Sequence, residues 1–225
     1  ETLRRLHPRY ESEVMAFVQH DPARPYRLAL DLARMAHAGL PVVLAVLHDR
    51  GGGTLRHVQE LAQHLSAQAT VLTLTPAPAH SVSLRMARLH EGFELVFRLQ
   101  DQRDDLLLAL RQIGVSHVHY HHLLGHDPWV MGLPQQLGVA YDFTAHDFYS
   151  FCTRISMTGD DNRYAGEPCS GLCNCCDPQE AAPVGGGTVA DWRERNRHFL
   201  AGARQVLTPS RDTARRMAGF APGAH

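Results

Sequence analysis

PVVLAVLHDRGGGTLRHVQELAQHL, residues 41–65, contains an apolar run, three consecutive glycines and an amphipathic segment, in that order. The run at 42–47 is nearly continuous in aliphatic and β-branched residues, which is typical of a strand buried on both faces of a parallel sheet. After the glycines, Val58, Leu61 and Leu65 recur at the spacing of one helix face. The stretch therefore predicts a strand, a glycine loop and a helix.

The glycine loop is suited to a ligand that approaches the main chain. Gly51, Gly52 and Gly53 can adopt backbone angles closed to other residues, and the helix that follows points unpaired N–H groups at the loop. We expect an anion there, most often a phosphate; the alternative is a tight connection with no ligand. The spacing matches neither GxGxxG nor GxxxxGK[ST], which argues against a dinucleotide fold of the usual kind and against a P-loop NTPase.

The rest of the chain continues to alternate between strand and helix patterns. This alternation predicts a Rossmann-like α/β fold, with a mostly parallel sheet and helices on both faces. Two alternating segments, 81–87 and 93–100, are expected as strands near a sheet edge. The other expected strands are 69–76, 117–122, 139–147 and 205–210, and the expected helices are 104–113, 126–137, 190–203 and 211–220.

Composition shifts divide the chain into segments. We expect packing helices over 1–38, the Rossmann-like domain over 39–210 and a final helix over 211–225. Within the domain, 148–189 is rich in Gly, Cys, Pro and Asp without a clear period, which indicates an irregular insertion.

The net charge of −1 over 225 residues argues against nucleic acid as the main partner. All 22 basic residues are arginine, so no lysine is present for Schiff-base chemistry. No apolar run is long enough to cross a membrane and no signal peptide is recognisable, so we expect a cytoplasmic protein. Because the sequence begins at Glu1 and stops just after a helical pattern, we expect it to be part of a longer polypeptide.

TAHDFYSFC places His146 and Asp147 where a strand ends and an irregular loop begins. A histidine there can exchange a hydrogen bond with a bound hydroxyl near neutral pH. The alternative is a histidine that only caps the strand end. In parallel sheets ligands bind outside the carboxyl ends of the strands, and the glycine loop, His121 and His122 are predicted at the same edge.

Alternating histidines in HVHYHH suggest a metal site, because zinc accepts imidazole readily. However, His117, His119 and His121 on one straight strand are spread over about 13 Å, too far to surround one ion. We therefore retain His121 and His122 only as pocket residues. A metal-dependent hydrolase is a weak hypothesis, since no open three-ligand arrangement is evident.

All five cysteines lie within the irregular segment, a clustering that favours metal over disulfide in a cytosolic protein. Four thiolates, from Cys152, Cys169, Cys173 and Cys176, have spacings that suit a structural zinc. The alternatives are free thiols or an adventitious disulfide.

Four blocks in order, HDRGGGTLRHVQELA, HVHYHHLLGH, LGVAYDFTAHDFYSFC and ARQVLTPSRDTARRM, resemble the N-terminal half of family 4 glycosyltransferases. These are retaining enzymes of the GT-B fold, and the similarity is closest to bacterial members that build surface polysaccharide. It extends over residues 40–220. The resemblance implies one half of a GT-B architecture, in which this domain receives the acceptor and an absent C-terminal domain binds most of the nucleotide sugar.

The resemblance also implies roles for individual residues. The three glycines would approach the donor diphosphate, and His146 would bond a sugar hydroxyl near the reacting carbon. The residues that would shape the pocket or face the cleft are Asp147, Tyr149, Arg56 and His57. This chain departs from relatives with a cysteine-bearing loop, because Ala165 follows the tyrosine of RYxGEP and a cysteine stands at 169 instead.

From the resemblance we expect transfer of a sugar from a nucleotide-sugar donor to a saccharide or lipid-linked acceptor, with no cofactor required for catalysis. Isolated residues 1–225 are expected to be inactive. A lipid-linked acceptor would bring the protein to the inner face of the membrane. The hypothesis from another class is a zinc-containing module that binds a saccharide or a protein without catalysis.

Overall fold

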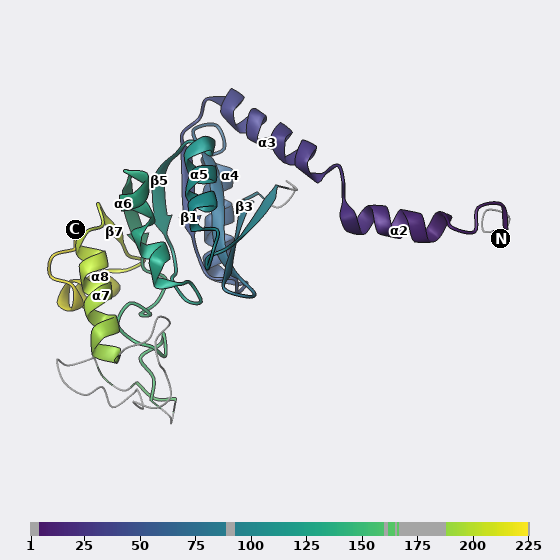
Figure 1. Cartoon of the computed structure of the whole chain (residues 1–225). Coiled ribbons are helices and arrows are strands. Elements are labelled where there is room, and N and C mark those ends of the chain that lie inside the picture. The colour runs from purple at the N-terminus through teal and green to yellow at the C-terminus, as the bar shows by residue number, and fades with distance from the viewer. Residues whose placement is uncertain (1–4, 89–92, 160–161, 165, 167–187, 225) are drawn as a thin grey trace. The chain divides into compact units, whose positions relative to one another are not determined.

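The computed structural model (Figure 1) describes residues 5–88, 93–159, 162–164, 166 and 188–224. The chain forms two compact units, Glu1–Gly39 and Leu40–His225. The first unit contains α2 (Tyr10–His20) and α3 (Arg24–Ala38), where helical periodicity predicted helices. No residue of α2 is buried. The packing role expected for this segment stays a prediction.

The second unit is built on a seven-stranded sheet in the order β4-β3-β2-β1-β5-β6-β7. The pairs among β2, β1, β5, β6 and β7 are parallel, while β3 pairs antiparallel with both β2 and β4 at one edge. This confirms the predicted Rossmann-like α/β fold and the two edge strands. The strands are β1 (Val42–Val46), β2 (Thr70–Ala77), β3 (Ser81–Met86), β4 (Glu94–Arg98), β5 (Val115–Tyr120), β6 (Ala140–Thr144) and β7 (Val206–Leu207).

The central strand β1 is buried on both faces. Ala45 and Leu47 pack in one buried cluster with Val58 of α4 (Gly53–His64). Residues of a strand alternate between faces, so Leu44 and Val46 face the other side, where both are fully buried. Burial of each such side chain contributes about 1.5–3 kcal/mol, which explains why an almost continuous apolar run forms this strand.

The remaining helices of the second unit are α5 (Arg103–Ile113), η1 (Pro128–Gly132), α6 (Leu133–Leu137), α7 (Val189–Ala201) and α8 (Arg211–Phe220). The single helix predicted over 126–137 is confirmed in part, because residues 128–137 are helical and end at Gly138, but as a 3-10 turn followed by a short α-helix. Pro134, in the first turn of α6, has no N–H to donate to a preceding carbonyl, so the two elements do not join into one regular α-helix.

The short strand β7 is anchored to β6 by side chains as well as by backbone. Asp142 of β6 accepts from Nε and Nη2 of Arg204 at 3.0 and 2.6 Å. Tyr141 stacks on Phe199 of α7, with ring centroids 5.1 Å apart. These contacts position α7 beside β6.

The first part of the expected insertion packs against this framework. Phe151, Cys152 and Met157 are buried, and Nε of Arg193 in α7 donates to the carbonyl of Phe151 at 2.8 Å. The other proposed zinc ligands, Cys169, Cys173 and Cys176, lie outside the described residues. Among the described residues, no helix combines the length and the apolarity needed to cross a membrane.

Candidate functional site

Side chains at the adjoining ends of β5 and β6 form a ladder of hydrogen bonds. In each of four pairs the partners are 25 residues apart, because the two parallel strands hold one register. The pairs are His117 Nε2 with Asp142 Oδ2 (3.0 Å), His119 Nε2 with Thr144 Oγ1 (2.8 Å), His121 Nδ1 with His146 Nε2 (3.1 Å) and His122 Nε2 with Asp147 Oδ2 (2.9 Å). The last two pairs lie beyond the strands, because His121 and His122 follow the end of β5 while His146 and Asp147 follow the end of β6.

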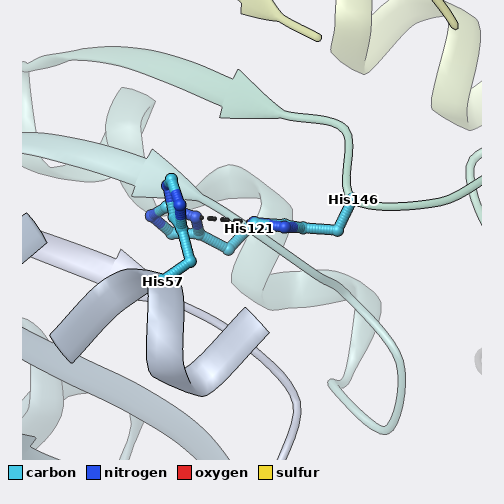
Figure 2. Close-up of side chains that lie close together, drawn as sticks. All are labelled: His57, His121 and His146. Carbon is cyan, nitrogen blue, oxygen red and sulfur yellow. Dashed lines mark hydrogen bonds between the residues drawn. The ribbon is translucent and has the colours of Figure 1, made fainter. Parts of the chain in front are cut away.

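Three imidazoles, one from α4 and one each from the segments that follow β5 and β6, lie close together in a cluster (Figure 2). His57 comes from α4, His121 follows β5, and His146 follows β6. One ring nitrogen from each residue lies within 4.8 Å of the other two. The rings of His57 and His146 have centroids 5.1 Å apart, so the helix after the glycine loop contacts the histidine that follows β6. We call these three residues the histidine cluster.

The three side chains of the histidine cluster differ in their exposure to solvent. His121 is only 1% exposed, His146 is partly buried and His57 is exposed. Nε2 of His121 is fully buried, and no described residue shares a hydrogen bond with it. The cluster therefore has a closed inner side and an accessible outer side.

Burial keeps the inner rings uncharged. It lowers the pKa of His146 to about 4, and the nearby His57 ring acts in the same direction. Burial, followed by the influence of His119 and His146, lowers the pKa of His121 well below its ordinary value. Both rings are therefore neutral at pH 7, and each has a nitrogen lone pair with which to accept a hydrogen bond or bind a metal.

Asp147 is committed to holding the loop after β6. Its Oδ2 faces Nε2 of His122, and its Oδ1 accepts from the backbone N–H of Tyr149 at 2.8 Å. Nδ1 of His122 accepts from the N–H of Leu124, so its Nε2 carries the proton and donates to Asp147. Burial raises the pKa of Asp147, but the His122 bond and the Tyr149 N–H outweigh it, and the pKa is lowered.

The glycine loop is open on its ligand side. Gly52 is the N-cap of α4 at φ 108° and ψ −155°, and no described side chain caps the helix. A Cβ built on Gly51, Gly52 or Gly53 would meet no atom within 4 Å. The first N–H groups of α4 are thus accessible to an anion. Arg56, by contrast, already pairs with Glu60 at 2.7 Å.

A groove of about 640 Å³ begins beside the same loop. It is bounded by His48 and Arg50 after β1, by Leu55 and Gln59 of α4, and by residues of the β2–β3–β4 edge, among them Arg85. The groove is thus lined by apolar, amide, cationic and acidic groups together, and Arg85 pairs with Glu94 within it. His57, His121 and His146 do not line it.

Comparisons with known proteins give no family for the chain. No family model matches it, and no curated protein matches it. Among solved structures, the chain is similar to the crystal structure of pyridoxal kinase from Lactobacillus plantarum, with 12% sequence identity and a TM-score of 0.37. The match covers 82% of this chain and 54% of the kinase chain, so this chain spans about half the length of that protein. The chemistry of the site is therefore inferred from its own residues.

The structure brings some of the predicted site residues together and leaves others apart. His57, His121 and His146 converge, while His122, Asp147 and Tyr149 form a neighbouring hydrogen-bonded group. The expectation that no open three-ligand arrangement exists stays a prediction. The fold nevertheless brings together one histidine from each of three elements, a convergence that spacing along one strand does not reveal. The only signal in the sequence is that each histidine stands near the same predicted sheet edge.

Proposed function

We propose that this chain is the acceptor-side half of a retaining glycosyltransferase, whose nucleotide-sugar donor is held mainly by a second domain of the same protein. The acceptor is a saccharide or a lipid-linked saccharide, as in surface polysaccharide synthesis. A lipid-linked acceptor would bring the protein to the inner face of the membrane. The order of the four sequence blocks supports the family assignment.

The observation that carries the proposal is the contact between His57 and His146, whose ring centroids are 5.1 Å apart. His57 stands on α4, the helix whose N-terminus follows the glycines, and His146 stands at the end of β6. An anion at Gly51–Gly53 and a sugar hydroxyl at His146 would therefore share one site. Transfer from a nucleotide sugar requires this proximity, because the diphosphate is bonded to the anomeric carbon of the sugar ring and leaves from that carbon as the acceptor oxygen bonds to it.

Each group of the site has a task in this proposal. The open N–H groups at the start of α4 would donate hydrogen bonds to the diphosphate oxygens. His146, neutral at pH 7, would share a hydrogen bond with a sugar hydroxyl and orient the ring. Asp147 would only hold the neighbouring residues in place, because its two oxygens already accept hydrogen bonds from His122 and from the N–H of Tyr149. The groove beside the loop, with Arg85 and Gln59 in its walls, would receive the acceptor.

The test uses the full-length protein, incubated with a panel of nucleotide sugars and saccharide acceptors. We expect release of nucleoside diphosphate and a product whose anomeric configuration, read by NMR, equals that of the donor. His146→Ala should lower kcat by about 100-fold, because a misplacement of the substrate by about 1 Å can cost about 10²-fold. Its melting temperature should change little, because the ring is partly exposed.

His64→Ala is the matched control for that experiment. His64 is an exposed histidine near the end of α4 and is remote in sequence from the loop. Its replacement should leave both turnover and stability unchanged. A full-length protein that lacks a second βα domain, consumes no nucleotide sugar or keeps its turnover in His146→Ala would contradict the proposal.

A further inference from the structure

We propose that His57, His121 and His146 bind one divalent transition-metal ion, with Zn²⁺ as the preferred ion and one coordination position left open. This site goes beyond the proposed sugar transfer, which requires no metal. It also differs from the cysteine zinc site expected from the sequence, because it uses nitrogen ligands at the carboxyl edge of the sheet.

The distances between ring nitrogens fit a shared ion. Two imidazole nitrogens on one tetrahedral zinc, each about 2.0–2.1 Å from the metal, are about 3.4 Å apart. Nδ1 of His121 and Nε2 of His146 are 3.1 Å apart, and all three ligand atoms lie within 4.8 Å of one another. His57 is exposed, so its side chain can rotate toward the ion without disturbing the core.

The buried side of the cluster holds its inner ligand in place. His121 is 1% exposed, so its ring cannot turn outward into solvent. The ring of His119 packs 4.1 Å from that of His121, and Thr144 holds His119 in turn. The imidazole of His121 is therefore fixed in its orientation before any ion arrives.

The donor set selects the kind of ion. Three neutral imidazoles suit Zn²⁺, Co²⁺, Ni²⁺ and Cu²⁺, whereas Mg²⁺ and Ca²⁺ require oxygen ligands. The nearest carboxylate along the chain, Asp147, is already bonded to His122 and to the N–H of Tyr149.

The fourth position would face the exposed side of His57. Three protein ligands with one open position are typical of zinc sites that bind a water or a ligand oxygen. A water held there would lose a proton near pH 7, and a phosphate or hydroxyl oxygen could replace it. We therefore expect the fourth ligand to bind the ion through an oxygen atom.

The experiment titrates the purified chain with Co²⁺ and follows the visible d–d absorption of tetrahedral cobalt, with Zn²⁺ added afterwards as competitor. Thiolate ligands add intense near-ultraviolet charge-transfer absorption that imidazoles do not give, so binding by the cysteine set Cys152, Cys169, Cys173 and Cys176 is recognised separately. We expect one equivalent of cobalt with nitrogen-type absorption, displaced by one equivalent of Zn²⁺.

The variants are His57→Ala and, as matched control on the same helix, His64→Ala. Loss of a residue that only orients a metal ligand costs about 10–100-fold in affinity, so loss of the ligand His57 should cost at least about 10-fold. His64→Ala should bind like the parent. His57 is exposed, so its variant should fold, which circular dichroism checks.

Failure to bind cobalt with nitrogen-type absorption, or equal affinity in His57→Ala and the parent, would overturn the metal site. Metal binding is measured without donor or acceptor. Its failure therefore leaves the sugar-transfer proposal standing, and an inactive protein that still binds one ion through His57 would support the metal site alone.

Discussion

His122 donates from Nε2 to Oδ2 of Asp147 at 2.9 Å and thereby joins the end of β5 to the loop after β6. The imidazole is 3% exposed, and its other nitrogen accepts from the N–H of Leu124. Tyr149 stacks on the same ring, with centroids 4.8 Å apart, and donates its N–H to Asp147. One carboxylate thus fixes the position of the residues beside His146.

Asp147→Ala should therefore destabilise the fold by about 1–3 kcal/mol, because it leaves a buried imidazole N–H without an acceptor. Urea denaturation measures the difference. Asp101→Ala is the control, since Asp101 pairs with Arg98 at the surface and such pairs contribute about 0–1 kcal/mol. Equal losses in the two variants would show that the bond from His122 contributes no more than a surface pair.

Two adjacent glycines should respond differently to alanine. Gly52 has φ 108° and ψ −155°, a conformation that costs a residue with a side chain about 1–3 kcal/mol. Gly53 is helical and its Cβ would meet open space, so Gly53→Ala should leave stability unchanged or raise it by up to about 1 kcal/mol. Thermal unfolding compares the two variants.

Gly53→Ala should also weaken anion binding, because the added methyl stands where a ligand would approach the main chain. Titration with inorganic pyrophosphate, followed by NMR shifts of the amides of residues 51–55, measures this. If pyrophosphate shifts the parent and Gly53→Ala equally, close approach to this glycine is not part of binding.

Acid should destabilise the fold through His126. Burial lowers the pKa of His126 to about 4, although its bond to the Leu47 carbonyl acts in the opposite direction. As the pH falls, His126 of the unfolded chain takes up a proton near pH 6.5, whereas His126 of the folded chain does so only near pH 4. Stability is full above about pH 6.5 and falls toward pH 4, by up to about 1.4 kcal/mol per pH unit for this residue.

His126→Phe should flatten that slope, whatever it does to stability at pH 7. Urea denaturation at several pH values from 7 to 4 provides the measurement, and His64→Gln, an exposed change, should leave the slope as it is. An unaltered slope in His126→Phe would mean that the residue does not contribute to the acid response.

Gly202→Ala should destabilise the fold by about 1–3 kcal/mol through overpacking. The new Cβ would stand 2.6 Å from the hydroxyl oxygen of Tyr141, which donates to the Phe199 carbonyl. Gly202 has φ −85°, so no backbone strain adds to the steric cost. Gly219→Ala, with open space around its Cβ, should be neutral.

A double variant isolates the clash. Tyr141→Phe removes the oxygen that the new methyl would meet, so Gly202→Ala should cost less in the Tyr141→Phe background than alone. Additive effects in urea denaturation would refute the steric explanation.

Local patterns predicted most of the framework. The apolar run at 42–47 and the amphipathic helix after it depend on residues close in sequence, and the alternating segments at 81–87 and 93–100 do so as well. Apolar periodicity predicts one helix over 126–137, but the missing N–H of Pro134 interrupts the α-helical hydrogen bonds, and the segment divides into a 3-10 turn and a short α-helix.

The histidine cluster could not be predicted in the same way. Its members stand at 57, 121 and 146, and their distances depend on which strands are neighbours and in what register. His117, His119 and His121 alternate along one strand and its extension, and each bonds a different residue, Asp142, Thr144 and His146 respectively. The convergence of His121 with His146 and His57 required the strand order β1-β5-β6, which the sequence does not specify.

The constant offset of 25 residues in the β5–β6 ladder has a consequence for how this region tolerates change. All four pairs depend on one register, in which His117 pairs with Ala140. Insertions within the crossover that connects the two strands leave this register free to form. A single insertion inside either strand moves the following side chains to the opposite face and separates the pairs together. Evolutionary drift in length should therefore accumulate in the crossover and be absent from both strands.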